Sequence, residues 1–321
     1  MKPGNNRSFF HQAGFTLVEL MVGLAIGMLA TLVIMQVFSV FETQKRTTTG
    51  TADAQTNGGI ALYNIGRELQ IAGYSLLPAV NSPLECTTLN VNGVADATVP
   101  NRLTPVAITD GASDTITIRY GNSLMGGIPT QMTGATTVNN NFGCQIGDTA
   151  IVISADGLTC NMTSVNALSA AGVTPATVTL ANAVIGAELA CLGTWNEITY
   201  AVNNGNLQRS GQDTVAGIVN LQAQYGVSAA ANSNQVNQWV NATGGTWAAP
   251  TVANRNRIKA VRIAVVARNA KREPDSVTAS PLTVWNGGPT VSLSAEEQHY
   301  RYRVFETIIP LRNMIWSRDT L

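Results

Sequence analysis

One carboxylate inside an apolar run is the residue of this chain best placed to do chemistry. Glu19 is the fifth residue of a 27-residue, mostly apolar run that starts at Phe15, directly after Gly14. An acid at the centre of a membrane helix is unfavourable by about 2.5–3.5 kcal/mol, and by less near an end. Glu19 therefore needs a partner, and the nearest possible one is the α-amino group that cleavage before Phe15 would free.

Four cysteines lie beyond this run, where export would expose them to an oxidising compartment. They are Cys86, Cys144, Cys160 and Cys191. Exported proteins pair such cysteines, and the wide spacing, without a C-x-x-C, does not suit a zinc site. We predict two disulfides. Three pairings are possible, and chain order is our only ground for preferring Cys86–Cys144 with Cys160–Cys191.

No other constellation indicates catalysis. Apart from His11 near the N-terminus, the only histidine is His299, which has no Ser/Asp or Cys partner set in a recognisable motif. Residues 147–157 hold two aspartates without the spacing of a calcium-binding loop, and no glycine-rich phosphate loop is present. We predict a protein that is not an enzyme and holds no metal or cofactor.

The composition indicates an exported protein. Charged residues make up 12% of the chain, and without Lys2 and Arg7 it has 17 basic and 19 acidic residues, a formal charge of −2. A nucleic-acid partner is not predicted, because such proteins present a basic face. The 280 residues after Phe41 can bury a substantial core as one large domain, and their length also allows two.

The helical pattern continues beyond the apolar run. An apolar stripe at helical spacing comprises Leu62, Ile65, Leu69 and Ala72, and Arg67, Glu68 and Gln70 lie off it. Gly73 is a stop signal, and residues 47–50 and 57–59 have low helix propensity. We predict a helix over 15–72 that can bend or melt at those two stretches. Gly23 and Gly27 favour close helix packing in an assembly over a specific dimer.

The rest of the chain is predicted to form short strands and turns. The predicted strands are 115–120, 149–154, 176–180, 197–202, 221–227, 261–267 and 300–309. The last two alternate as half-buried antiparallel strands do, with one polar face. Residues 228–256, which include Trp239 and Trp247, are predicted to be a long surface insertion.

The start of the chain resembles the class III signal of type IV pilins and pseudopilins. The matching residues are Gly14, Phe15, Thr16, Leu17, Val18, Glu19 and Leu20. In that family a prepilin peptidase cuts after the glycine and methylates the new amine. The resemblance implies cleavage between Gly14 and Phe15, N-methylation of Phe15, and pairing of Glu19 with the Phe15 amine of a neighbouring subunit.

Two other kinds of N-terminal segment fit less well. A secretory signal peptide has its apolar region before the cut, whereas here the region follows Gly14. A plain membrane anchor explains the length of the run but neither Glu19 nor the Gly14–Phe15 junction. The leader carries Lys2 and Arg7 and no acid, which suits a cytoplasmic position.

Four further stretches resemble the PilW family of minor pilins. They are GRELQIAGYS at 66–75, SDTITIRYG at 113–121, IVNLQAQYGV at 218–227 and RYRVFETIIPLRNMIW at 301–316. The resemblance implies an α+β, type IV pilin-like fold, in which a long N-terminal helix packs on an antiparallel β-rich head. Residues 1–14 would be the cleaved cytoplasmic leader, 15–75 the long helix with 15–41 transmembrane, and 76–321 the periplasmic head.

The same resemblance implies a role. A PilW-like minor pilin primes assembly of type IV pili, enters the fibre at or near its tip, and supports adhesion and twitching motility. Its expected partners are other minor pilins, the major pilin, the prepilin peptidase, the inner membrane and a large tip adhesin. It would reside in the inner membrane with a periplasmic head, and then in the pilus at the cell surface.

Two rival functions stay open at this point. One is a minor pseudopilin of the J type in a type II secretion system, which shares the signal, the long helix and a β-rich head. The other is a binding module in which residues 228–256 act as the adhesin. The C-terminal stretch at 301–316 favours the pilus subunit.

Overall fold

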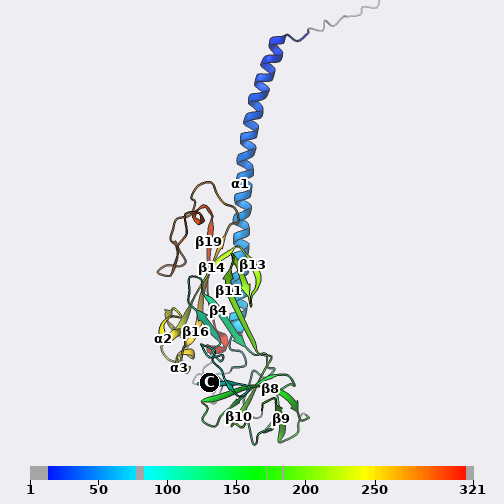
Figure 1. The fold of residues 1–321 in the computed structure, drawn as a ribbon, viewed down its shortest axis with the longest axis vertical. Coiled ribbons are helices and arrows are strands. Elements are labelled where there is room, and N and C mark those ends of the chain that lie inside the picture. Colours follow the sequence, from blue (N-terminus) through cyan, green and yellow to red (C-terminus); the bar gives the residue numbers. More distant parts are fainter. Residues whose placement is uncertain (1–13, 77–82, 171, 183, 316–321) are drawn as a thin grey trace, which may run out of the picture. The chain divides into compact units, whose positions relative to one another are not determined.

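A long helix followed by a β-rich head makes up the computed structural model, which describes residues 14–76, 83–170, 172–182 and 184–315. Helix α1 (Leu17–Ile71) is followed by β-strands and a few short helices (Figure 1). The chain divides into two compact units, Met1–Gly50 and Thr51–Leu321. The predicted α+β class is confirmed. Apart from Gly14, the predicted leader lies outside the described residues.

Helix α1 is helical through both stretches of low propensity. The Thr48 and Thr56 hydroxyls donate to the carbonyls of Gln44 and Ala52, so both are satisfied inside the helix. Gly58 is buried, and a Cβ there would overlap the Phe305 ring. Gly58 lowers helix propensity, but its missing side chain lets the Phe305 ring approach the helix backbone.

The second half of α1 packs its apolar stripe on the head. The buried stripe consists of Ala54, Ala61, Ile65, Leu69 and Ala72, with Leu62 partly buried. The expectation that Glu68 lies away from the packed face is wrong, because its side chain is buried as well. Periodicity showed where apolar residues face, but not that a charged neighbour has a partner in the sheet.

The described part of the head contains four sheets. The eight-stranded sheet consists of β1 (Thr88–Val91), β2 (Val94–Ala95), β5 (Thr130–Gln131), β6 (Thr137–Val138), β7 (Thr149–Ile153), β8 (Thr159–Leu168), β9 (Ala176–Leu180) and β10 (Glu188–Gly193). Its main path runs β2-β1-β8-β7-β10-β5, with β9 joined to β8 and to β6. Most pairs are antiparallel, as predicted, but β1 and β8 are parallel.

The other sheets are smaller. The five-stranded sheet, in the order β13-β12-β11-β4-β3, contains β3 (Val106–Thr109), β4 (Thr115–Tyr120), β11 (Asn196–Asn203), β12 (Asn206–Arg209) and β13 (Gln212–Ala216). The four-stranded sheet, in the order β15-β14-β16-β19, contains β14 (Ile218–Ser228), β15 (Val236–Val240), β16 (Ile258–Arg268) and β19 (Tyr302–Pro310). Strands β17 (Leu282–Thr283) and β18 (Thr290–Val291) form a hairpin.

Short helical segments complete the described chain. They are α2 (Gly244–Trp247), α3 (Val252–Arg255), α4 (Arg312–Ile315) and the 3-10 turns η1 (Pro83–Glu85) and η2 (Glu297–His299). All seven predicted strands are present, and β4 and β9 have the predicted bounds.

Strand β16 is buried on both faces, so the prediction of a half-buried strand there is wrong. Val261, Ile263 and Val265 belong to the main core. On the other face Ala264 and Val266 belong to a second cluster with Val284 and Trp285. The residues around the β17–β18 hairpin cover the face that alternation had assigned to solvent, and Arg262 lies over the Trp285 ring at 5.2 Å.

Residues 228–256 are not a plain surface insertion. They contain β15, α2 and α3, and Arg255 at the end of α3 is buried. Its guanidinium donates to the carbonyls of Leu84 and Cys86, the latter at 3.0 Å. Burial lowers the pKa of Arg255 to about 10. The segment is therefore tied to the core by a residue that the sequence pattern did not single out.

The head contains two disulfides, as predicted, but our preferred pairing was wrong. The bonds join Cys86 to Cys160 and Cys144 to Cys191, with Cα–Cα distances of 5.8 and 5.2 Å. The cause of the first is the parallel pairing of β1 with β8, in which Leu89 lies opposite Cys160. That pairing joins segments 74 residues apart, which chain order does not show.

Glu68 joins α1 to the five-stranded sheet. Its Oε1 accepts from Arg209 Nη2 at 2.8 Å, and its Oε2 accepts from the Tyr120 hydroxyl at 3.2 Å. Burial and the charge of Glu68 raise the pKa of Tyr120 to about 12. The Asn204–Gly205 turn sets the β11–β12 register, in which Arg209 lies opposite Tyr200. The hairpin therefore places Arg209 beside the helix.

We expect Glu68→Gln to lower the free energy of unfolding by about 1–3 kcal/mol, because a neutral amide cannot replace the charge-assisted bonds to Arg209. Chemical denaturation of the detergent-solubilised chain, followed by tryptophan fluorescence, measures this change. The matched control is Glu306→Gln, which breaks the more exposed pair with Arg262 and should cost less than about 1 kcal/mol. An equal loss in both variants would contradict the anchoring role of Glu68.

Candidate functional site

The start of α1 is closed by a reciprocal pair of hydrogen bonds between Thr16 and Glu19. Glu19 Oε2 accepts from the backbone N–H and the hydroxyl of Thr16, both at 3.1 Å. Thr16 Oγ1 lies 3.3 Å from the backbone nitrogen of Glu19, and the Thr16 carbonyl accepts from Leu20 N–H. This is a capping box, with Thr16 at N-cap and Glu19 at N3.

Glu19 therefore has a nearer partner than an α-amino group, which our sequence reasoning missed. The signal was present as the spacing T-x-x-E at Thr16 and Glu19. All the bonds at this carboxylate use Oε2, and within the described residues Oε1 accepts no hydrogen bond. A carboxylate oxygen has room for further donors. The cap and a pairing with a cation from outside the chain are thus compatible.

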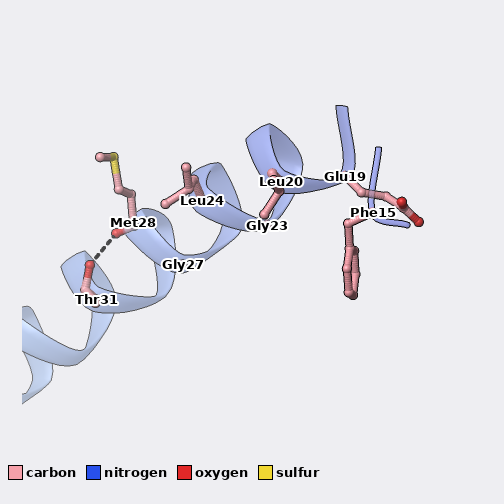
Figure 2. A pocket seen from close by; sticks show the side chains of 8 residues that line it. All are labelled: Phe15, Glu19, Leu20, Gly23, Leu24, Gly27, Met28 and Thr31. Carbon is pink, nitrogen blue, oxygen red and sulfur yellow. Dashed lines mark hydrogen bonds between the residues drawn. The ribbon is translucent and has the colours of Figure 1, made fainter. Parts of the chain in front are cut away.

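A shallow groove follows Glu19 along one face of α1. Its volume is about 610 Å³, and its lining consists of Phe15, Glu19, Leu20, Gly23, Leu24, Gly27, Met28 and Thr31. Figure 2 shows the Phe15 ring and the Glu19 carboxylate at the start of the helix, and the bare backbone of Gly23 and Gly27 farther along it. Residues four apart lie on one helix face, so the carboxylate and both glycines share it.

Both glycines leave the helix backbone accessible. Nothing lies within 4 Å of the positions where a Cβ would stand on Gly23 or Gly27. Small residues at this spacing allow the backbone of a second helix to come close. The groove is thus suited to an apolar helix, and the carboxylate at its end is suited to a cation.

The first part of α1 is also apolar and uncovered. Every residue from Gly14 to Phe41 is exposed. Among the described residues, α1 is the one helix long and apolar enough to cross a membrane. A helix that is apolar on all sides must be buried in lipid or among other helices. The predicted span at 15–41 is consistent with this property.

The remaining candidate residues make structural contacts. The imidazole Nδ1 of His299 lies 3.1 Å from the Glu273 carbonyl oxygen. In the 147–157 segment, Asp148 accepts from the Gln145 N–H at 2.7 Å and Asp156 accepts from the Leu158 N–H at 2.9 Å. Within the described ranges, no three His, Cys, Asp or Glu side chains form a group that could hold a metal ion.

Two family models match the chain, one near its N-terminus and one in the head. Residues 10–35 match the prokaryotic N-terminal methylation motif, and residues 194–313 match type IV pilus-assembly protein W. The first match contains the Thr16–Glu19 cap and the two glycines. The second runs from before β11 past the end of β19. Searches of curated proteins and of solved structures found no match.

The methylation motif and the apolar helix fit a membrane-anchored pilin. With the second match, they support a PilW-like type IV pilus protein with a pilin-like role in pilus assembly. The match includes two of the four stretches that resemble this family, apart from the last residues of the C-terminal one. The stretches at 66–75 and 113–121 lie outside it.

We expect Gly27→Leu to reduce co-purification with other pilus subunits at least severalfold, because the added side chain fills the groove that a second helix would enter. The matched control is Ala25→Leu, which places the same side chain two residues away, at a position that does not line the groove. Quantitative mass spectrometry of the solubilised complexes measures the effect. Equal co-purification of both variants would contradict a docking role for the groove.

Proposed function

We propose that this protein is a minor pilin that primes assembly of type IV pili and enters the fibre at or near its tip. The observation that carries the proposal is the placement of one carboxylate at the start of an uncovered apolar helix, inside the residues that match the methylation motif. An apolar helix of this kind can move from lipid into a bundle of similar helices, which is what a pilus subunit must do.

In this proposal, assembly begins with processing of the N-terminus. Prepilin peptidase cuts between Gly14 and Phe15 and methylates the Phe15 amine, which removes the basic leader and creates a cation at the helix start. Cleavage leaves the Thr16–Glu19 cap in the chain, since both residues follow the cut. The capping bonds hold the carboxylate in a defined position at the first turn.

Assembly then pairs Glu19 with the Phe15 amine of a neighbouring subunit. The apolar face around Gly23 and Gly27 lets the two helices approach, and the ion pair fixes how far one slides along the other. Leaving a buried charge without its partner costs about 3–5 kcal/mol. A register in which amine and carboxylate miss each other is therefore disfavoured.

The proposed cellular location follows from the apolar helix and the head. Residues 15–41 span the inner membrane, and the head from residue 76 onward lies in the periplasm before it joins the fibre at the cell surface. The two disulfides support this placement, because such bonds persist in oxidising compartments. Other minor pilins, the major pilin and a large tip adhesin are the proposed partners. The role is structural, and it supports adhesion and twitching motility.

The match to a pilus-assembly family favours this role over a type II secretion pseudopilin. The adhesin alternative for residues 228–256 gains no support from the fold. That segment forms an edge strand and two short helices tied to the core by Arg255, and such contacts suit packing.

We expect Glu19→Ala to leave membrane insertion intact and to lower recovery of partner pilins with the protein at least tenfold, because the neighbouring amine loses its counter-ion. Pull-down from solubilised membranes measures the recovery. Thr16→Val is the matched control, because it weakens the cap, at about 0.5–2 kcal/mol, and retains the carboxylate. If Thr16→Val lost partners as severely as Glu19→Ala, helix capping and not intersubunit pairing would explain the effect.

We expect Gly14→Val to block cleavage and leave a protein that is longer by the 14 residues of the leader. The physical reason is that a side chain at this position obstructs the close approach of a peptidase to the scissile bond. Intact-mass measurement of the purified chain reads the difference directly. Gly4→Val in the same leader is the control and should be processed normally. A mature-size product from Gly14→Val would refute the cleavage site.

A further inference from the structure

The four-stranded sheet ends in a long strand with one open edge. Strand β19 (Tyr302–Pro310) pairs with β16 along its length and is last in the order β15-β14-β16-β19. Within the described residues, no strand pairs with its other side. An open edge presents a row of unpaired N–H and C=O groups, and proteins usually cover or shorten such edges. The edge of β19 is nine residues long.

A groove runs beside this edge between β19 and α1. Its volume is about 400 Å³, and it is lined by Leu62, Tyr63, Gly66, Arg67, Gln70, Thr307 and Ile309. All these residues come from α1 and β19 and none from β16, so the groove lies on the outer side of β19. At Gly66 the helix and the strand come together, since a Cβ there would lie 3.1 Å from Ile309 Cδ1.

Two large apolar side chains border the edge and are left exposed. Tyr63 on α1 is 66% exposed, and Ile308 on β19 is 50% exposed. Ile309, next in sequence to Ile308, points toward the groove, so Ile308 points to the other face of the sheet. A strand added to β19 would place alternate side chains against Tyr63 in the groove and beside Ile308 on the other face. Strand addition uses backbone hydrogen bonds for affinity and such alternate contacts for specificity.

Positive charges near the open edge of β19 would favour an acidic partner strand. Arg67 lines the groove, and Arg303 lines a second cavity of about 280 Å³ between α1 and the start of β19. In the described part of the chain neither arginine has an ion-pair partner, whereas Glu306 is paired with Arg262 at 2.7 Å. A second copy of β19 would bring its own Arg303 to these cations, and the acid of that strand, Glu306, is already paired with Arg262. An acidic strand fits, and a copy of this strand does not.

We propose that β19 receives an extended strand from another pilus subunit, apolar at alternate positions and acidic near its ends. The inference rests on the proposed assembly role and adds a second contact, in the head, to the one between helices. The helix contact fixes the register within the apolar bundle, and the strand contact selects which subunit lies beside this one.

In-cell photo-crosslinking tests the proposal. A photoreactive phenylalanine derivative replaces Ile308 or Tyr63 in the full chain, and mass spectrometry identifies the crosslinked peptide. We expect both positions to react with one short segment of a single other pilin, at residues on opposite faces of an extended strand. The control is Ile185, which is 78% exposed and outside any strand. Adducts no stronger than at Ile185, adducts within a helix, or adducts with a second copy of this chain would overturn the proposal.

Charge reversal and a helix probe complete the test. Arg67→Glu and Arg303→Glu should each reduce the adduct yield by up to about fivefold, the range for an exposed ion pair, and unchanged yields would overturn the acidic partner. A photoreactive group at Leu24 reports the helix contact. Adducts at Leu24 without adducts at β19 would refute the strand contact alone, whereas no adduct at either site would refute the assembly role as well.

Discussion

The account depends on one constraint, which is that a charged carboxylate lies at the start of an apolar helix. Glu19 is held by Thr16 through a capping box, so the chain satisfies one of its oxygens locally. The capping bonds do not neutralise the charge. In the proposed mechanism, the helix leaves lipid for a bundle, where the negative charge needs a cation, and the amine freed at Phe15 would supply it. The open backbone at Gly23 and Gly27 would let a second helix come close enough to bring that amine.

The head contains a second carboxylate that can fix the position of α1, and this one is buried. Glu68 lies on the packed side of α1 and binds Arg209 and Tyr120 from two strands of the five-stranded sheet. The close approach of Phe305 to Gly58 sets how near α1 comes to the four-stranded sheet. The bonds of Glu68 set where along α1 the five-stranded sheet is held. In both halves of α1, a carboxylate would therefore specify position while apolar contacts supply most of the stabilisation.

Local pattern was enough to predict the long helix and seven of the strands but not their long-range contacts. The α1 stripe follows from helical periodicity, and the strands β4 and β9 follow from β-branched residues between turn signals. The burial of Glu68 does not, because its partner Arg209 is 141 residues away. The disulfide pairing failed for the same reason, since it follows from the parallel alignment of β1 with β8. The second buried face of β16 depends on the segment around β17 and β18, which has no strong strand pattern. At the start of α1, the sequence singled out Phe15 and Glu19, which line the groove, but the roles of Gly14, Phe15 and Glu19 stay predictions. The Thr16 cap was readable from the sequence and was overlooked.

The most direct test of the central claim is a distance measurement between Glu19 and Phe15 across subunits. Solid-state NMR on a membrane-reconstituted complex can use one pool of subunits labelled with ¹³C at the Glu19 carboxyl and another with ¹⁵N at the Phe15 amine. The account predicts dipolar coupling between the pools that corresponds to an ion pair, with nitrogen and oxygen within about 4 Å. A Glu19 carboxyl carbon that shows no coupling to the Phe15 nitrogen of the other pool would contradict it.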